Sequence, residues 1–144
     1  MITSETPAFQ DFNIFGVDHI SPENALEELQ NGSAIFVDVR EESEFMIELI
    51  PLNNVFHFPM SVIMDNLQNI PTDKPIIVVC QGGVRSAKVA YMLNRNGFIN
   101  SVNLDGGLKT WKAKGLPFES ILPEACSSCS GSCSSSSSCS CSTE

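Results

Sequence analysis

The sequence predicts an α/β fold with a mostly parallel, five-stranded sheet flanked by helices on both faces. Short apolar segments alternate along the chain with segments in which apolar residues recur at helical spacing. The apolar segment 75–79 is rich in β-branched residues and has no polar alternation, which is typical of a central strand covered on both faces. Strands that alternate with helices form parallel sheets through right-handed crossovers.

Each predicted element is bounded by residues that start or end helices and strands. Residues 17–20 form a short strand, and Ser21 and Pro22 then start a helix as its N-cap and first residue. That helix ends near Asn31-Gly32. The elements that follow are a strand at 34–39, an acidic helical turn at 41–45, a strand at 55–58, a helix after Pro59 that ends near residue 70, the strand at 75–79, a helix ended by Asn96-Gly97, a strand at 101–104 and a last helix at about 108–114.

Length and composition are those of one globular domain with short extensions. The 144 residues can bury one core, and we divide them into a lead-in at 1–16, a domain at 17–122 and a tail at 123–144. The net charge of −9 argues against nucleic acid or an anionic membrane as a partner. The N-terminus shows no signal peptide and no stretch is long enough to span a bilayer, so we expect a cytoplasmic protein, and a monomer.

The segment Cys80-Gln81-Gly82-Gly83-Val84-Arg85-Ser86 is the candidate active site. It follows the buried strand and precedes a helix, so the cysteine lies at the carboxyl edge of the sheet, where ligands bind in such folds. The two glycines allow successive N–H groups to turn inward, and the helix N-terminus adds its positive end. Both effects favour the nucleophilic thiolate of Cys80, and Arg85 supplies a cation for an anionic substrate.

Asp38 and Arg40 close the strand at 34–39 at the same edge of the sheet. Opposite charges at such a position form structural ion pairs or capping networks more often than they take part in catalysis. We therefore predict a structural role for both residues.

Three separated segments together resemble the rhodanese-like sulfurtransferases. Asp38-Val39-Arg40 with Glu44-Phe45 is similar to that family's DVR…EF segment, and Cys80 to Ser86 is similar to its CxxGxRS loop. Leu104-Asp105-Gly106-Gly107, followed by Trp111 and Gly115-Leu116-Pro117, is similar to its closing LxGGxxxWxxxGLP segment. The resemblance covers about residues 17–118 and implies structural roles for Gly106, Gly107 and Trp111.

The resemblance implies that Cys80 attacks the outer sulfur of a small anionic donor such as thiosulfate, releases sulfite and passes the sulfur from a persulfide to a thiol or protein acceptor. Cys80 and Arg85 are then the catalytic residues. Sulfur exchange by a thiolate requires no general base and no cofactor, which suits a chain with only two histidines, His19 and His57. The substrate-binding loop consists of Gln81, Gly82, Gly83, Val84 and Ser86.

One segment departs from the family pattern. Where members carry GHIPGA, this chain has Glu48-Leu49-Ile50-Pro51-Leu52-Asn53, and Pro59 lies two residues farther from Pro51 than is usual. We therefore expect an altered loop before the strand at 55–58, at the rim of the substrate entrance.

Three other functions compete with sulfur transfer. A cysteine hydrolase would need a histidine beside Cys80, and His57 is the only remote candidate. A phosphatase or arsenate reductase of the same fold would carry five residues between cysteine and arginine, whereas this loop has four, which favours a single sulfur atom over a tetrahedral oxyanion. A non-catalytic binding module would not need the cysteine at all.

The C-terminal tail differs from the rest of the chain. Residues 126–142 are serine, cysteine and one glycine, with no apolar side chain to bury other than cysteine, so we expect no fold there without a ligand. The spacings CxxC and CxC suit Zn²⁺ or Cu⁺, and a tail thiol could also accept sulfur from Cys80. The candidate ligands are Cys126, Cys129, Cys133, Cys139 and Cys141.

Overall fold

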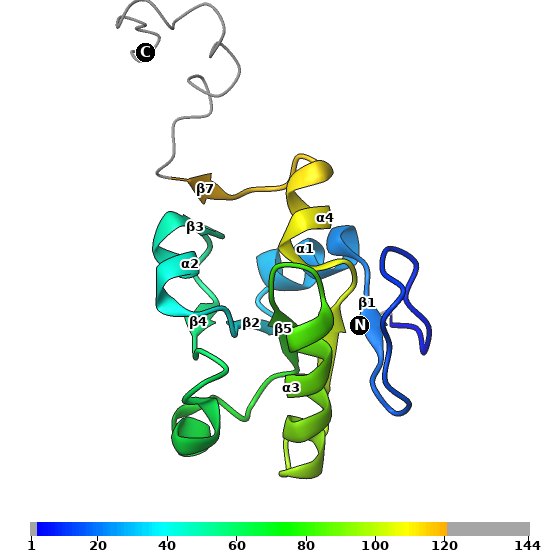
Figure 1. Cartoon of the computed structure of the whole chain (residues 1–144), viewed down its shortest axis with the longest axis vertical. Coiled ribbons are helices and arrows are strands. Elements are labelled where there is room, and N and C mark those ends of the chain that lie inside the picture. Colours follow the sequence, from blue (N-terminus) through cyan, green and yellow to red (C-terminus); the bar gives the residue numbers. More distant parts are fainter. Residues whose placement is uncertain (1–2, 121–144) are drawn as a thin grey trace, which may run out of the picture.

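The computed structural model describes residues 3–120, in which a five-stranded parallel sheet lies between helices (Figure 1). The strands stand in the order β1-β6-β5-β2-β4, and every neighbouring pair is parallel. The predicted fold class is therefore confirmed. The strands are β1 (His19–Ile20), β2 (Ile35–Asp38), β4 (Val55–His57), β5 (Ile76–Val79) and β6 (Ser101–Leu104).

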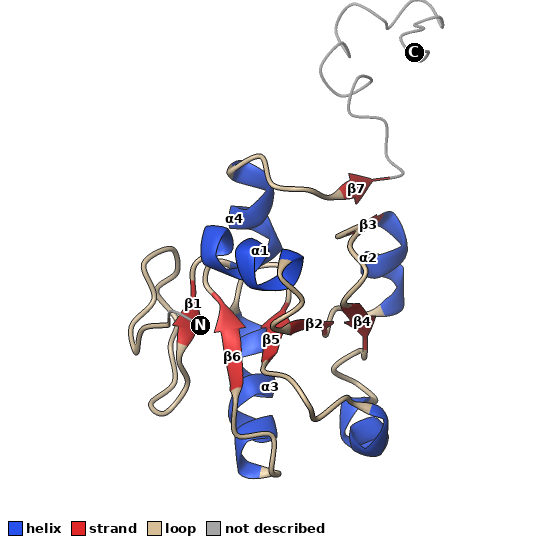
Figure 2. Ribbon diagram, turned by 180° about the vertical axis from the view of Figure 1, so that it is seen from behind, coloured by secondary structure: helices blue, strands red, loops and turns tan. Residues whose placement is uncertain are grey.

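The helices that connect these strands cover both faces of the sheet (Figure 2). Ser21 is the N-cap of the first one, where its hydroxyl accepts a hydrogen bond from the Asn24 N–H at 3.3 Å, as predicted. The helices are α1 (Pro22–Gln30), α2 (Glu42–Ile47), the 3₁₀ helix η1 (Ile63–Asn69), α3 (Val84–Arg95) and α4 (Gly107–Ala113).

Strand β5 lies at the centre of the core, and all four of its residues are buried. Because side chains alternate along a strand, its residues contribute to two separate apolar layers. Ile76 and Val78 pack with α3 and η1 on one face, and Ile77 and Val79 pack with α1 and α4 on the other. The helical residues in these layers are Ile63, Val89, Ala90 and Leu93 on the first face, and Ala25, Leu29, Leu108 and Trp111 on the second.

Two parts of the fold differ from the prediction. The helix expected after Pro59 is the 3₁₀ helix η1, interrupted at Asn66, whose side chain binds the Val62 carbonyl at 2.9 Å. Asparagine competes in this way with regular helical bonds. A second, two-stranded sheet also forms from β3 (Glu48–Leu49) and β7 (Glu119–Ser120), which pair antiparallel. The segment that departs from the family pattern thus begins with a strand that pairs with the last described residues of the chain.

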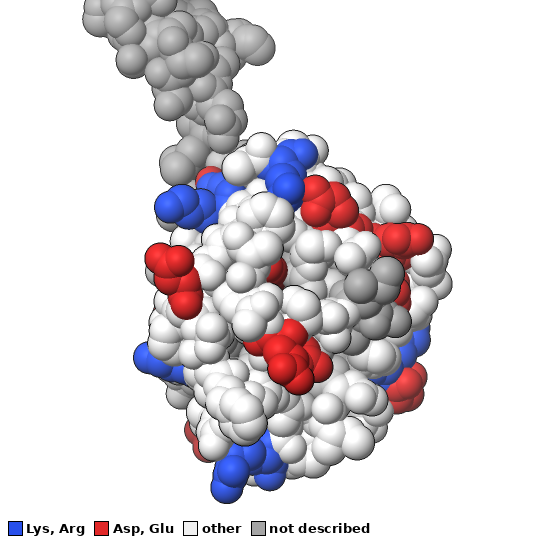
Figure 3. Space-filling view, turned by 90° about the vertical axis from the view of Figure 1, so that its right-hand side faces the viewer, with Lys and Arg blue, Asp and Glu red and all other residues white. Residues whose placement is uncertain are grey.

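Acidic residues outnumber basic ones in the sequence, 17 to 8. On the face that Figure 3 shows, acidic and basic side chains are interspersed among uncharged ones. Within residues 3–120, no helix combines the length and the apolar character needed to cross a bilayer.

Asp38 and Arg40 form an ion pair in the interior, where each residue is only 1% exposed. The Arg40 Nη2 lies 2.8 Å from Asp38 Oδ2 and also donates to the Glu48 carbonyl at 2.5 Å. The pair therefore links the end of β2 to the start of β3. These are the two residues for which the sequence predicts a structural role, and that role stays a prediction.

We expect Asp38→Ala to lower the free energy of unfolding by about 3–5 kcal/mol, because the Arg40 guanidinium would stay buried without a counter-charge. Urea denaturation measures this change. Asp73→Ala, which removes an exposed loop carboxylate, is the matched control. A loss below about 1 kcal/mol in Asp38→Ala would contradict the structural role.

Candidate active site

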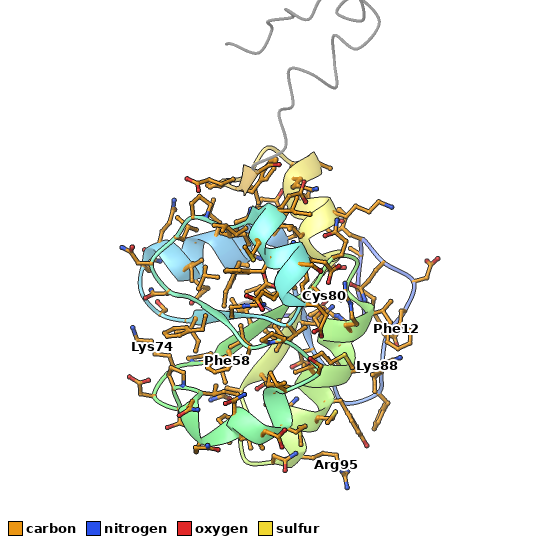
Figure 4. All side chains as sticks on the ribbon, turned by 60° about the vertical axis from the view of Figure 1, so that its left-hand side comes forward. Phe12, Phe58, Lys74, Cys80, Lys88 and Arg95 are labelled. Carbon is orange, nitrogen blue, oxygen red and sulfur yellow. The ribbon has the colours of Figure 1, made fainter. Side chains whose placement is uncertain are left out.

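Cys80 directly follows β5, at the carboxyl edge of the sheet and in front of the N-terminus of α3 (Figure 4). The residue is 1% exposed and belongs to the apolar layer under α3. The central strand thus fixes the position of the sulfur, while the residues after it determine what the sulfur contacts.

Two backbone N–H groups point at the Cys80 sulfur. The Gly83 N–H donates to Sγ at 3.0 Å and the Ser86 N–H at 3.3 Å, and the thiol itself contacts the Ser86 hydroxyl at 3.3 Å. Gly83 is the N-cap of α3 in a left-handed conformation, with φ of 94°. Oriented N–H groups at a helix N-terminus stabilise negative charge, so this cradle suits a thiolate.

The first turn of α4 closes the loop from the other side. The Leu108 N–H donates to the Cys80 carbonyl at 2.8 Å, and the Lys109 N–H donates to the Gln81 carbonyl at 2.9 Å. This approach requires Gly107, because a Cβ there would lie 2.7 Å from both carbonyl oxygens. The loop carbonyls are thereby bound to α4, and the N–H groups of Gly83 and Ser86 remain for the sulfur.

Arg85 pairs with Glu44 of α2. Its two terminal nitrogens bind the two carboxylate oxygens at 2.8 and 3.0 Å, and about a third of each side chain is exposed. The hydrogen bond to Glu44 raises the pKa of Arg85, and the same bond lowers the pKa of Glu44. Sequence reasoning missed Glu44 as a site residue, although the Glu44-Phe45 motif signalled it.

A buried polar chain leads away from the sulfur. The Ser86 hydroxyl donates to Asn103 Oδ1, and Asn103 Nδ2 lies 3.1 Å from Gln10 Oε1 and 2.9 Å from His19 Nδ1. Sequence reasoning missed Asn103 and Gln10. An amide side chain within a strand was a signal for Asn103, whereas nothing local distinguishes Gln10.

Neither histidine touches Cys80. His57 Nε2 binds the Arg40 carbonyl at 2.8 Å, and its ring stacks on Phe45 with centroids 4.1 Å apart. Burial lowers the pKa of His19, partly offset by Asp105 and Asp18, so its imidazole is held neutral. Within the described residues, neither histidine is therefore placed to serve as the base of a cysteine hydrolase.

Trp111, which is predicted to be structural, lies in the apolar layer on the opposite face of the sheet from Cys80. Trp111 is fully buried, donates to the Pro117 carbonyl at 2.6 Å and packs edge-on against Phe36. Val84 begins α3 and is 40% exposed. The five tail cysteines lie outside the described residues. Within residues 3–120, no three His, Cys, Asp or Glu side chains come together in a way that could hold a metal ion.

Comparisons with known proteins agree with this architecture. The chain is 38% identical over 90 residues to the uncharacterized protein YqhL of Bacillus subtilis, covering 61% of this chain and 70% of the relative. It is 30% identical over 100 residues to the thiosulfate sulfurtransferase GlpE of Actinobacillus succinogenes, covering 69% and 88%.

The fold matches a crystal structure of a rhodanese-related protein from Thermoplasma volcanium, with a TM-score of 0.64, 28% identity and coverage of 70% of this chain and 96% of that one. The family model of the rhodanese-like domain matches residues 21–114. This stretch includes the Cys80 loop, the ion pair of Asp38 and Arg40, and the glycines that close the site. The chain belongs to the rhodanese-like domain family.

Proposed function

We propose that this protein is a sulfurtransferase that moves a sulfane sulfur from thiosulfate or a similar anionic donor to a thiophilic acceptor. The observation that carries the proposal is the position of the Cys80 sulfur, which accepts two backbone N–H bonds at the N-terminus of α3. The relatives named thiosulfate sulfurtransferase support the donor class.

The proposed reaction requires only a nucleophile and a good leaving group. The Cys80 thiolate attacks the outer sulfur of thiosulfate, the S–S bond of the donor breaks, and sulfite leaves with the bonding electron pair. The outer sulfur stays on Cys80 as a persulfide. An acceptor thiolate then attacks that sulfur, and Cys80 leaves as a thiolate. No step needs a general base, in keeping with the position of both histidines away from the sulfur.

The loop length favours sulfur over phosphate or arsenate chemistry. Four residues separate Cys80 from Arg85, so the ring of N–H donors is too short to surround a tetrahedral oxyanion. A binding module without catalysis would not require a cysteine sulfur that accepts two backbone N–H bonds, so this geometry favours an enzyme.

Replacement of the nucleophile is the first test. Cys80→Ser should lower the rate of sulfite release from thiosulfate, with cyanide as acceptor, by at least about three orders of magnitude, because a serine hydroxyl is not ionised at neutral pH. Mass spectrometry of the intact wild-type chain after thiosulfate treatment should show at least one added sulfur atom. Turnover by Cys80→Ser, or efficient hydrolysis of an aryl phosphate by the wild type, would overturn the assignment.

Arg85 is the proposed electrostatic anchor for the donor, and Glu44 competes with the donor for its guanidinium. Arg85→Ala should therefore raise the donor KM roughly tenfold. Glu44→Gln leaves Arg85 in place but removes the competing negative charge, so it should lower the donor KM. Steady-state kinetics with varied thiosulfate measure both values. An equal rise of the donor KM in Arg85→Ala and Glu44→Gln would instead indicate that the ion pair has only a structural role.

The tail is a second proposed element of the reaction. Strand β7 ends at Ser120, which pairs with Glu48 directly after α2, the helix that carries Glu44. Strand β7, the last described element, thus pairs with the segment that follows the helix bearing the partner of Arg85. From Ser120 to Cys129 the chain can span up to about 30 Å. A tail thiolate could attack the outer sulfur of the Cys80 persulfide, which would release the Cys80 thiolate and leave a persulfide on the tail.

Peptide mass spectrometry after thiosulfate treatment tests this relay. We expect an added sulfur atom on tail cysteines of the wild type, and none on the tail of Cys80→Ser, because the sulfur reaches the tail only through Cys80. The chain with all five tail cysteines changed to serine should keep its sulfur on Cys80. One equivalent of Zn²⁺ tests the alternative metal site, since bound thiolates would no longer accept sulfur. Sulfur on the tail of Cys80→Ser would contradict the relay.

A further inference from the structure

The lead-in before the family domain reaches the active site through one side chain. Gln10 precedes the matched residues 21–114, yet both ends of its amide contact the segments that form the cysteine site. Its Oε1 accepts the Gly106 N–H at 2.8 Å and the Asn103 amide at 3.1 Å. Its Nε2 donates to the Gly83 carbonyl at 3.2 Å and to the Phe12 carbonyl at 2.7 Å.

Two short routes connect this amide to the Cys80 sulfur. In the first, Gln10 binds the carbonyl of Gly83, the residue whose N–H donates to the sulfur. In the second, Gln10 orients Asn103, which binds the Ser86 hydroxyl, and Ser86 contacts the sulfur through both its hydroxyl and its N–H. Both groups that donate backbone N–H bonds to the sulfur are therefore held, directly or through one residue, by Gln10.

The backbone on either side of Gln10 is anchored, so its side chain has a defined place. The Asp105 carboxylate accepts the N–H groups of Ala8 at 2.6 Å and Phe9 at 3.0 Å. On the other side, the Lys88 ammonium lies 5.9 Å from the centre of the Phe12 ring, and Figure 4 shows these two residues beside the first turns of α3. A cation over an aromatic face adds a modest attraction.

The shape of the loop also fits the glutamine. A Cβ on Gly83 would overlap the Gln10 amide, and the φ of 94° at this position already disfavours any other residue. The absence of a side chain at Gly83 is thus what allows the amide to approach the loop.

We infer that Gln10 is a positioning residue of the cysteine site, and that the lead-in completes this site by holding the N–H donors of Gly83 and Ser86 on the sulfur. The inference rests on the proposed sulfur transfer for its kinetic consequence. The inference also implies that Gln10 makes the Cys80 thiol more reactive, and this consequence does not depend on which sulfur donor is used.

The test compares Gln10→Ala with Gln10→Glu, and Gln30→Ala, an exposed glutamine at the end of α1, is the matched control. In Gln10→Glu the carboxylate can still accept hydrogen bonds from the Gly106 N–H and the Asn103 amide, but it cannot donate one to the Gly83 carbonyl. We expect Gln10→Ala to lower kcat for thiosulfate roughly 5- to 20-fold with a nearly unchanged donor KM, because the amide does not touch substrate. Gln10→Glu should lose part of this activity, and the control should lose none.

Alkylation of Cys80 by iodoacetamide separates positioning from general stability. The tail-serine chain, in which Cys80 is the remaining cysteine, serves as the background. At about pH 7 the alkylation rate should fall in Gln10→Ala, whereas at about pH 10, where thiols are largely ionised, it should change much less. All measurements are made well below the melting temperature of each variant.

Wild-type kcat and wild-type alkylation in both Gln10 variants would overturn the inference, as would a rise in KM alone. If the wild type itself transferred no sulfur, the proposed function would fail, and the alkylation rates would still decide the role of Gln10.

Discussion

The structure depends on one constraint, which is that a cysteine sulfur must be held in the interior and still be given hydrogen-bond donors. Strand β5 provides the rigid support, because it is the central strand and is buried on both faces. The chain then turns through Gly83 into α3, so that the helix N-terminus faces the sulfur. An N–H group aimed at a buried sulfur is not readily replaced by water, so the geometry of this turn determines which donors the sulfur has.

Several separate elements hold that turn in place. The start of α4 binds the carbonyls of Cys80 and Gln81, which is possible only because Gly107 has no side chain. The ion pair of Asp38 and Arg40 links β2 to β3, next to the helix that carries Glu44, and Glu44 binds Arg85 at the rim. The lead-in reaches the same turn from the opposite side. The loop is thus fixed by contacts from most of the length of the described chain.

The chemistry that we propose matches what the site contains. Sulfur exchange proceeds by attack of one sulfur on another, so it needs charge stabilisation more than proton transfer. The site offers N–H donors and an arginine with a carboxylate partner, and its histidines are engaged elsewhere. The pairing with Glu44 gives the Arg85 guanidinium a counter-charge within the protein.

The sequence by itself determined the fold class, the central strand and the place of Cys80 before α3, since each of these follows from local periodicity and from the order of elements. It also indicated an ion pair between Asp38 and Arg40, which lie two residues apart. Only the tertiary structure decided the partner of Arg85, the contacts of Gln10 with Gly83 and Asn103, the pairing of β3 with β7 and the 3₁₀ form of η1. These features join residues that are distant in the chain, or they result from competition between side-chain and backbone hydrogen bonds, and neither cause leaves a periodic pattern in the sequence.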